Sequence, residues 1–96
     1  MTILLEVSSS DAASVLVPLV RACDRNAVAW NCFFTGDGVK TLARDDVLVT
    51  IAGAAKAAAC EVSWERHMGD QSCPVEIGSQ TNNSAMAGDA DRIVSL

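Results

Sequence analysis

The segment AVAWNCFFTGDG, residues 27–38, decides the fold. Its apolar character is almost continuous up to Phe34, as expected for a strand that is covered on both faces of a parallel sheet. The run then stops at Thr35 and a Gly-Asp-Gly turn. Because ligands in open α/β sheets lie beyond the carboxyl ends of the strands, this turn is expected to border a functional site.

Further strands are predicted outward from this segment. Short apolar runs predict them at residues 2–7, 57–64, 74–77 and 92–96. Together with residues 27–34 they make five strands. The prediction of the third, at residues 57–64, rests on the alternation of Cys60, Val62 and Trp64. With helices between the strands, the order predicts one α/β domain over residues 1–96 with a mostly parallel sheet of about five strands.

Two helices and several loops complete the predicted order. Residues 12–25 have apolar side chains at helical spacing, with Ser8 as the expected cap and with Pro18 expected to kink or delay the helix. Residues 39–56 predict the second helix. The polar stretch after Trp64 predicts a loop, and residues 78–91 predict a loop with at most a helical turn or two.

Composition narrows the classes of function. The chain has 96 residues, of which 50% are hydrophobic, and a net charge of −5, which argues against a disordered chain and against direct nucleic-acid binding. No stretch approaches the ~20 apolar residues of a membrane span, and the first residues lack the basic charges of a signal peptide. A cytoplasmic protein with four reduced cysteines and some apolar surface for self-association is therefore expected.

Three stretches resemble the DsrE/DsrF-like sulfur-relay family, which includes the TusD-type sulfurtransferase subunits. They are CFFTGDGV at residues 32–39, CEVSWERHMG at 60–69 and ADRIVSL at 90–96. The resemblance implies a three-layer α/β fold, assembly as a homo- or hetero-oligomer such as a trimer or hexamer, and other sulfur-relay proteins as partners. It also implies a cysteine that accepts sulfur as a persulfide and passes it onward, and the matching residue is Cys60.

Cys60 is the first candidate for the sulfur acceptor. A sulfur carrier needs a partly exposed thiolate and groups that lower its pKa, and Arg66 and His67 could act in this way if the loop folds back. The alternative is that Cys60 is a small buried apolar residue. Cys73, in a polar loop, is the second candidate, as a resolving or second carrier thiol, with an idle loop thiol as the alternative.

The remaining cysteines and the two tryptophans have simpler expectations. Cys23 and Cys32 lie on apolar faces and are expected to be inert. Trp30 and Trp64 are expected to pack in the core, with contact to a partner as the alternative.

Polar residues at the predicted strand ends could shape the site. Asp37, between Gly36 and Gly38, is expected to form a structural corner of it, although such turns are common without any function. Ser79 and Gln80 follow the fourth strand and could line the pocket, with a solvated loop as the alternative.

Other chemistries have less support. The spacing of Cys60, His67 and Cys73 matches no common zinc pattern. A single histidine without G-x-S-x-G disfavours a serine hydrolase, and the lack of C-x-x-C weakens a thiol redox module. No metal or other cofactor is expected. The hypothesis is intracellular persulfide transfer through Cys60, which leaves open whether the chain is an enzyme. The alternative is a non-catalytic assembly or binding subunit of the same fold, which the predicted loop after Trp64 favours.

Overall fold

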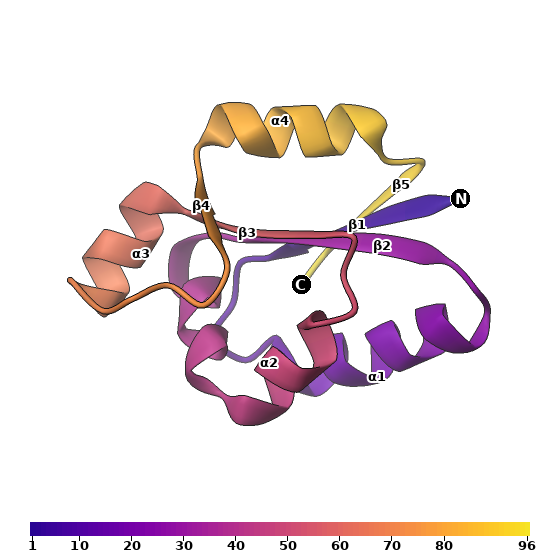
Figure 1. Cartoon of the computed structure of the whole chain (residues 1–96), viewed down its shortest axis with the longest axis horizontal. Coiled ribbons are helices and arrows are strands. Elements are labelled where there is room, and N and C mark those ends of the chain that lie inside the picture. Colours follow the sequence, from indigo (N-terminus) through magenta and orange to yellow (C-terminus); the bar gives the residue numbers. More distant parts are fainter.

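A five-stranded, all-parallel sheet forms the centre of the computed structural model, which describes residues 1–96 (Figure 1). The strands lie in the order β4-β3-β2-β1-β5. Their bounds are β1 Thr2–Val7, β2 Ala29–Phe34, β3 Lys56–Cys60, β4 Glu76–Gly78 and β5 Arg92–Ser95. This arrangement confirms the predicted three-layer α/β class.

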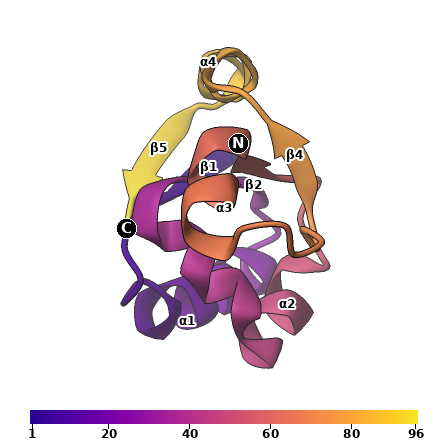
Figure 2. The same cartoon turned by 90° about the vertical axis from the view of Figure 1, so that its left-hand side faces the viewer.

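Helices cover the two faces of the sheet unequally. Their bounds are α1 Ala13–Arg25, the 3-10 helix η1 Gly36–Ala43, α2 Asp45–Ile51, α3 Glu61–Met68 and α4 Gln80–Asp89. Helices α1 and α2 pack on one face, whereas α4 crosses the other face alone (Figures 1 and 2). Helix α3 packs against η1, past the carboxyl ends of the strands. None of these helices combines the length and the apolar character that a bilayer crossing would need.

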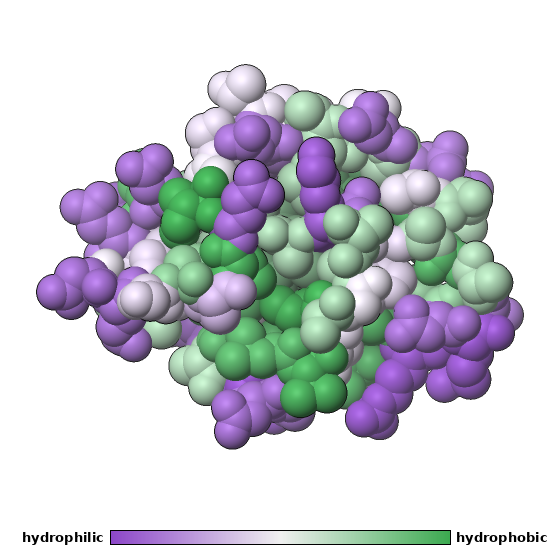
Figure 3. Space-filling model, in the orientation of Figure 1, coloured by the Kyte–Doolittle hydropathy of each residue, from purple (hydrophilic) through white to green (hydrophobic).

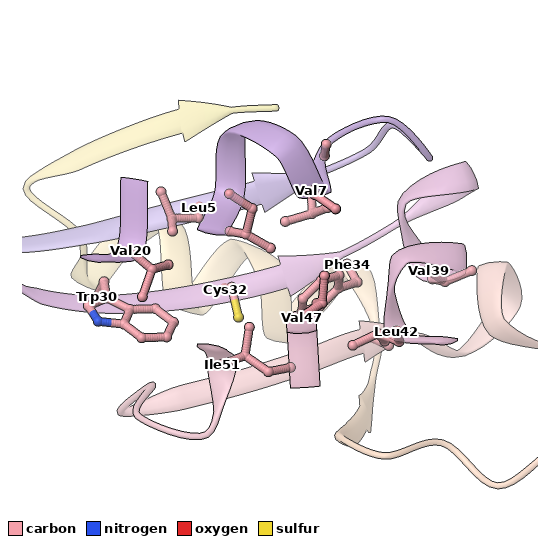
Figure 4. Close-up of a cluster of buried hydrophobic side chains, with 14 of the residues drawn as sticks. Leu5, Val7, Val20, Trp30, Cys32, Phe34, Val39, Leu42, Val47 and Ile51 are labelled. Carbon is pink, nitrogen blue, oxygen red and sulfur yellow. The ribbon is translucent and has the colours of Figure 1, made fainter. Parts of the chain in front are cut away.

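Alternation along each strand divides the buried residues between two clusters. Leu5, Cys32 and Phe34 point toward α1 and α2 and belong to the main cluster (Figure 4). Their neighbours Leu4 and Phe33 point the other way and form a smaller cluster with Ala58, Cys60 and Met86 of α4. We call this second side of the sheet the α4 face. Cys60 therefore lies under the single helix of the thinner layer.

The predicted third strand is wrong beyond Cys60. Strand β3 ends there, and the next residue begins α3, so the segment expected to be strand and loop is a helix. The alternation of Cys60, Val62 and Trp64 misleads because Val62 is 65% exposed and not part of any core. Glu61 in the first turn and His67 in the last turn complement the helix dipole and favour the helical form.

The predicted loop at residues 78–91 is also mostly wrong, since α4 contains ten residues. A capping box fixes its start: the Ser79 hydroxyl accepts from the Asn82 N–H at 3.3 Å, and Asn82 Oδ1 accepts from the Ser79 N–H at 2.7 Å. Met86 is the only buried residue of the helix. A helix with one buried side chain has almost no apolar periodicity, which explains why the sequence pattern does not reveal it.

The predicted helix at residues 39–56 is two helices, and β3 has already begun at Lys56. The break falls at Arg44, whose backbone is extended and whose guanidinium donates to the Asp46 carboxylate at 2.9 and 3.0 Å. Helix α1 corresponds to its prediction in extent, but Ala12 and not Ser8 is its N-cap. Pro18 lies inside α1 on the solvent side without interrupting it.

Both tryptophans are buried, which confirms their predicted place in the core. Trp30 is 2% exposed and its indole N–H donates to Asp24 Oδ1 at 2.9 Å. Trp64 is 6% exposed and donates to the Gln71 carbonyl at 2.8 Å. With their polar atoms satisfied inside the chain, neither indole offers a free surface for a partner.

Candidate functional site: a thiol at two helix starts

Cys60 lies where β3 ends and two helices begin. It is the N-cap of α3, and in the sheet register it is paired with Gly78, the last residue of β4. Ser79, the next residue, is the N-cap of α4. The unpaired N–H groups of a helix start carry positive partial charge, which favours an anion in their vicinity.

Polar groups around Cys60 favour its thiolate. Burial raises the pKa of the Cys60 thiol, but the Ser63 hydroxyl and N–H, the Gln80 side chain and the Val62 N–H more than offset this, so the pKa is lowered overall. Cys60 makes no capping hydrogen bond as a neutral thiol. The same donors bind a thiolate much better, because charge-assisted hydrogen bonds are stronger than neutral ones.

The thiol is more covered than a sulfur carrier was expected to be. Cys60 is 6% exposed and packs in the smaller cluster against residues such as Phe33 and Met86. A donor or acceptor of sulfur can therefore reach it only if α4 or the start of α3 moves. A cavity of about 90 Å³ lies on the α4 face next to this cluster, bounded by Ala58, Gly78 and Met86 among others.

The Gly-Asp-Gly turn is tied to the thiol through Ser63. Gly36 has a left-handed backbone with φ of 54°, which favours glycine, and its N–H donates to Ser63 Oγ at 2.8 Å. Gly38 lies in direct contact with the end of β1, where its position leaves no room for a side chain. The turn thus holds the serine that in turn favours the Cys60 thiolate.

None of the charged residues named from the sequence pairs with the thiol. His67 Nε2 lies 3.3 Å from Asp37 Oδ1, which joins α3 to η1, and Lys40 Nζ lies 3.9 Å from the same oxygen. Arg66 is exposed and makes no hydrogen bond or ion pair. The structure therefore brings Asp37 and His67 together as a surface pair, while Ser63 and Gln80 take the place next to Cys60 that was expected for Arg66 and His67.

The other cysteines are separate from Cys60. All four are free thiols, and Cys73 packs half-buried against the main cluster and not the smaller one. Burial raises the pKa of Cys73, partly offset by the Val75 N–H. Burial also raises the pKa of Cys23, and that of Cys32 to about 12, in agreement with the inert role predicted for both. No group of three or more His, Cys, Asp or Glu side chains is arranged to hold a metal ion.

Sequence reasoning missed Ser63. In a strand, residues three apart point to opposite faces, so Ser63 would have faced away from Cys60. At a helix start, the N-cap and N3 residues lie together, which is the relation that Cys60 and Ser63 have. A prediction of α3 would therefore have revealed the serine.

No protein-family model, curated protein or solved structure matches this chain. Fold and site define it as a small parallel α/β protein with a buried cysteine at a strand–helix junction, where neighbouring donors lower the pKa of the thiol.

Replacing Ser63 with alanine is expected to weaken both the site and the turn. Without the hydroxyl, the apparent pKa of Cys60 should rise, and the lost acceptor for the Gly36 N–H should lower the free energy of unfolding by ~1 kcal/mol. The pH dependence of Cys60 alkylation, read by peptide mass mapping, and urea unfolding measure the two effects. Ser84→Ala, at an exposed position of α4, is the matched control. An unchanged Cys60 pKa in Ser63→Ala would contradict the assignment.

Proposed function

We propose that this chain is an intracellular persulfide carrier in which Cys60 accepts sulfur and passes it to a partner's cysteine. The observation that carries the proposal is the set of donors from two helix starts that favours the Cys60 thiolate. The resemblance of three stretches to the DsrE/DsrF-like family supports it and makes other sulfur-relay proteins the expected partners, with a trimer or hexamer as the expected assembly.

Sulfur transfer through Cys60 consists of two thiol–persulfide exchange steps. The Cys60 thiolate attacks the outer sulfur of a donor persulfide, the donor's S–S bond breaks, and its electron pair leaves with the donor thiolate. A new S–S bond joins Cys60 to the transferred sulfur. An acceptor thiolate then attacks that outer sulfur and Cys60 leaves as a thiolate. Donors that favour the Cys60 thiolate assist both steps, because it is the nucleophile in the first and the leaving group in the second.

Access to Cys60 depends on α4. Met86 is the only fully buried side chain of the helix, and Ala87 is the only other residue of α4 that packs against the smaller cluster. Segments with few buried apolar contacts open locally at much lower free energy than the whole fold. The cavity of about 90 Å³ is lined by Ala58 and Met86 of the cluster that contains Cys60, and by Gly78, which is paired with Cys60 in the sheet. A shift of α4 could therefore extend this space to the thiol.

A second candidate is a non-catalytic assembly or binding subunit. The segment after Trp64 was predicted to be a loop, which favoured this second candidate. It belongs to helix α3, so it no longer supports the second candidate. The low exposure of Cys60, at 6%, now favours it instead. So does the surface: Val49 is 77% exposed and Ile77, on the edge strand β4, is 42% exposed, and hydrophobic surface gathers over α2 and near β4 in Figure 3.

Exposure of the folded chain to inorganic polysulfide, followed by mass mapping of the added sulfur, tests the proposal. We expect one sulfur atom on Cys60, transferable to a small thiol acceptor, and its loss in Cys60→Ser but not in Cys73→Ser. If no cysteine gains sulfur while light scattering shows stable oligomers, the assembly subunit is the correct function.

A further inference from the structure

Buried polar atoms without partners mark the α4 face. They are Glu6 Oε2, Asn31 Oδ1 and Asn83 Oδ1. Glu6 is the most unusual, because it places a carboxylate near the carboxyl end of β1, where the paired residue on β2 is Phe33. Burying a charged group costs free energy unless a partner compensates for it. The Glu6 carboxylate therefore requires an explanation.

Asn83 of α4 interacts with the Glu6 carboxyl, although Glu6 Oε2 itself has no partner. Burial raises the pKa of the Glu6 carboxyl, and the Asn83 side chain partly offsets this by hydrogen bonding to the carboxylate. Asn83 also contacts a second residue, since its Nδ2 donates to Gln80 Oε1 at 3.3 Å. One amide thus connects a half-buried carboxylate on β1 with the first residue of α4.

The contact with Asn83 determines which end of the Gln80 amide is free. With Oε1 engaged, Gln80 has its Nε2 group left to donate, and the Gln80 side chain is one of the groups that favour the Cys60 thiolate. The four residues form a continuous chain from Glu6 through Asn83 and Gln80 to Cys60. The Asn83 amide group donates to Gln80 Oε1, which leaves the Gln80 Nε2 group as the donor for Cys60.

We propose that Glu6 is a positioning residue of the Cys60 site, which acts through Asn83 to hold the Gln80 amide with Nε2 toward the thiolate. The inference deepens the proposed function, on which its significance for sulfur transfer rests. It also explains why a carboxylate is retained within an otherwise apolar strand.

The direction in which the Cys60 pKa changes when Glu6 is removed distinguishes a positioning role of Glu6 from a purely electrostatic one. A negative Glu6 acting through space would oppose ionisation of Cys60, so its removal would lower the thiol pKa. Positioning predicts the opposite, because removal frees the Gln80 amide. The other charged groups on the α4 face are Lys56 of β3, Glu76 of β4 and Asp89 of α4. Strands β2 and β5, which flank β1, place no charged side chain on this face.

The experiment measures the pH midpoint of Cys60 alkylation in variants of the full chain. We expect Glu6→Met and Asn83→Ala each to raise the midpoint and to slow alkylation of Cys60 at neutral pH about three- to tenfold, with no further change in the double variant because both break the same chain. Glu6→Gln retains an acceptor oxygen without the charge, and should return the midpoint to the wild-type value or below. Glu76→Met is the control, because Glu76 lies on the same face in register with Ala58 but is not among the groups that shift the Cys60 pKa.

A lowered midpoint in Glu6→Met, or independent additive effects of Glu6→Met and Asn83→Ala, would overturn the proposal. If Glu6→Met does not fold, Asn83→Ala decides alone, since alanine is favourable within a helix. Alkylation does not depend on sulfur transfer. A chain that fails to accept sulfur but shows the predicted midpoints would therefore refute the persulfide carrier and leave the positioning role of Glu6 standing.

Discussion

Replacing Gly38 with alanine is expected to lower the free energy of unfolding by about 3 kcal/mol. An added Cβ would overlap the Val7 carbonyl oxygen, and would lie 2.5 Å from the carbonyl carbon and 2.9 Å from the Ser8 nitrogen. All three are backbone atoms at the end of a central strand, so they cannot move aside as a flexible side chain could. Against the ~5–15 kcal/mol that stabilises a typical domain, this loss is severe.

Urea denaturation followed by circular dichroism measures this loss, and Gly88→Ala is the matched control. Nothing lies within 4 Å of a Cβ built at Gly88 in α4, so alanine there should raise the free energy of unfolding by ~0.5–1 kcal/mol through helix propensity. Equal stability of Gly38→Ala and the wild type would refute the close contact between the turn and β1.

The pKa of Cys60 is expected to lie below that of an ordinary thiol, and the pKa of Cys73 above it. The pKa of Cys60 is lowered from 9.0 and that of Cys73 is raised from 9.0, for the reasons given above. Because the thiolate is the reacting form, alkylation of Cys60 should reach half its maximal rate at lower pH than alkylation of Cys73. We therefore expect a larger fraction of Cys60 than of Cys73 to be ionised at pH 7 to 8.

Iodoacetamide labelling over a pH series, quantified peptide by peptide, measures both midpoints in one sample. The midpoint and not the absolute rate is the quantity to compare, because the two thiols differ in accessibility. Cys73 serves as the internal control in the same chain. A midpoint for Cys60 at or above that of Cys73 would show that burial outweighs the donors.

The central strands were predictable because their signal is strong. Residues 2–7 form β1 as predicted, and β2 differs from its prediction only at the start, where Ala27 has a positive φ of 53°. A parallel sheet follows from such continuous apolar runs with helices between them. The turn that begins at Gly36 also lies at the carboxyl edge of the sheet, as predicted. The close contact between Gly38 and the Val7 backbone explains why residue 38 is a glycine.

Helices α3 and α4 were not predictable from periodicity, because each buries a single side chain. Their formation depends on caps and on tertiary contacts such as that of Met86. The candidate site was likewise predictable only in part. Cys60 could be named from its position and from the resemblance, but the groups that act on it, Ser63 and Gln80, belong to the two helices that the pattern does not reveal.

The central claim is that the Cys60 sulfur can be reached in the folded protein, and native-state labelling tests it most directly. The measurement is the rate at which a small disulfide reagent modifies Cys60 and Cys32 in increasing, sub-denaturing urea. Cys32 is 0% exposed in the main cluster and should react only through global unfolding. We predict that Cys60 reacts much faster than Cys32, at a rate nearly independent of urea, because α4 opens locally. Equal protection of both thiols, with the same dependence on urea, would contradict the account.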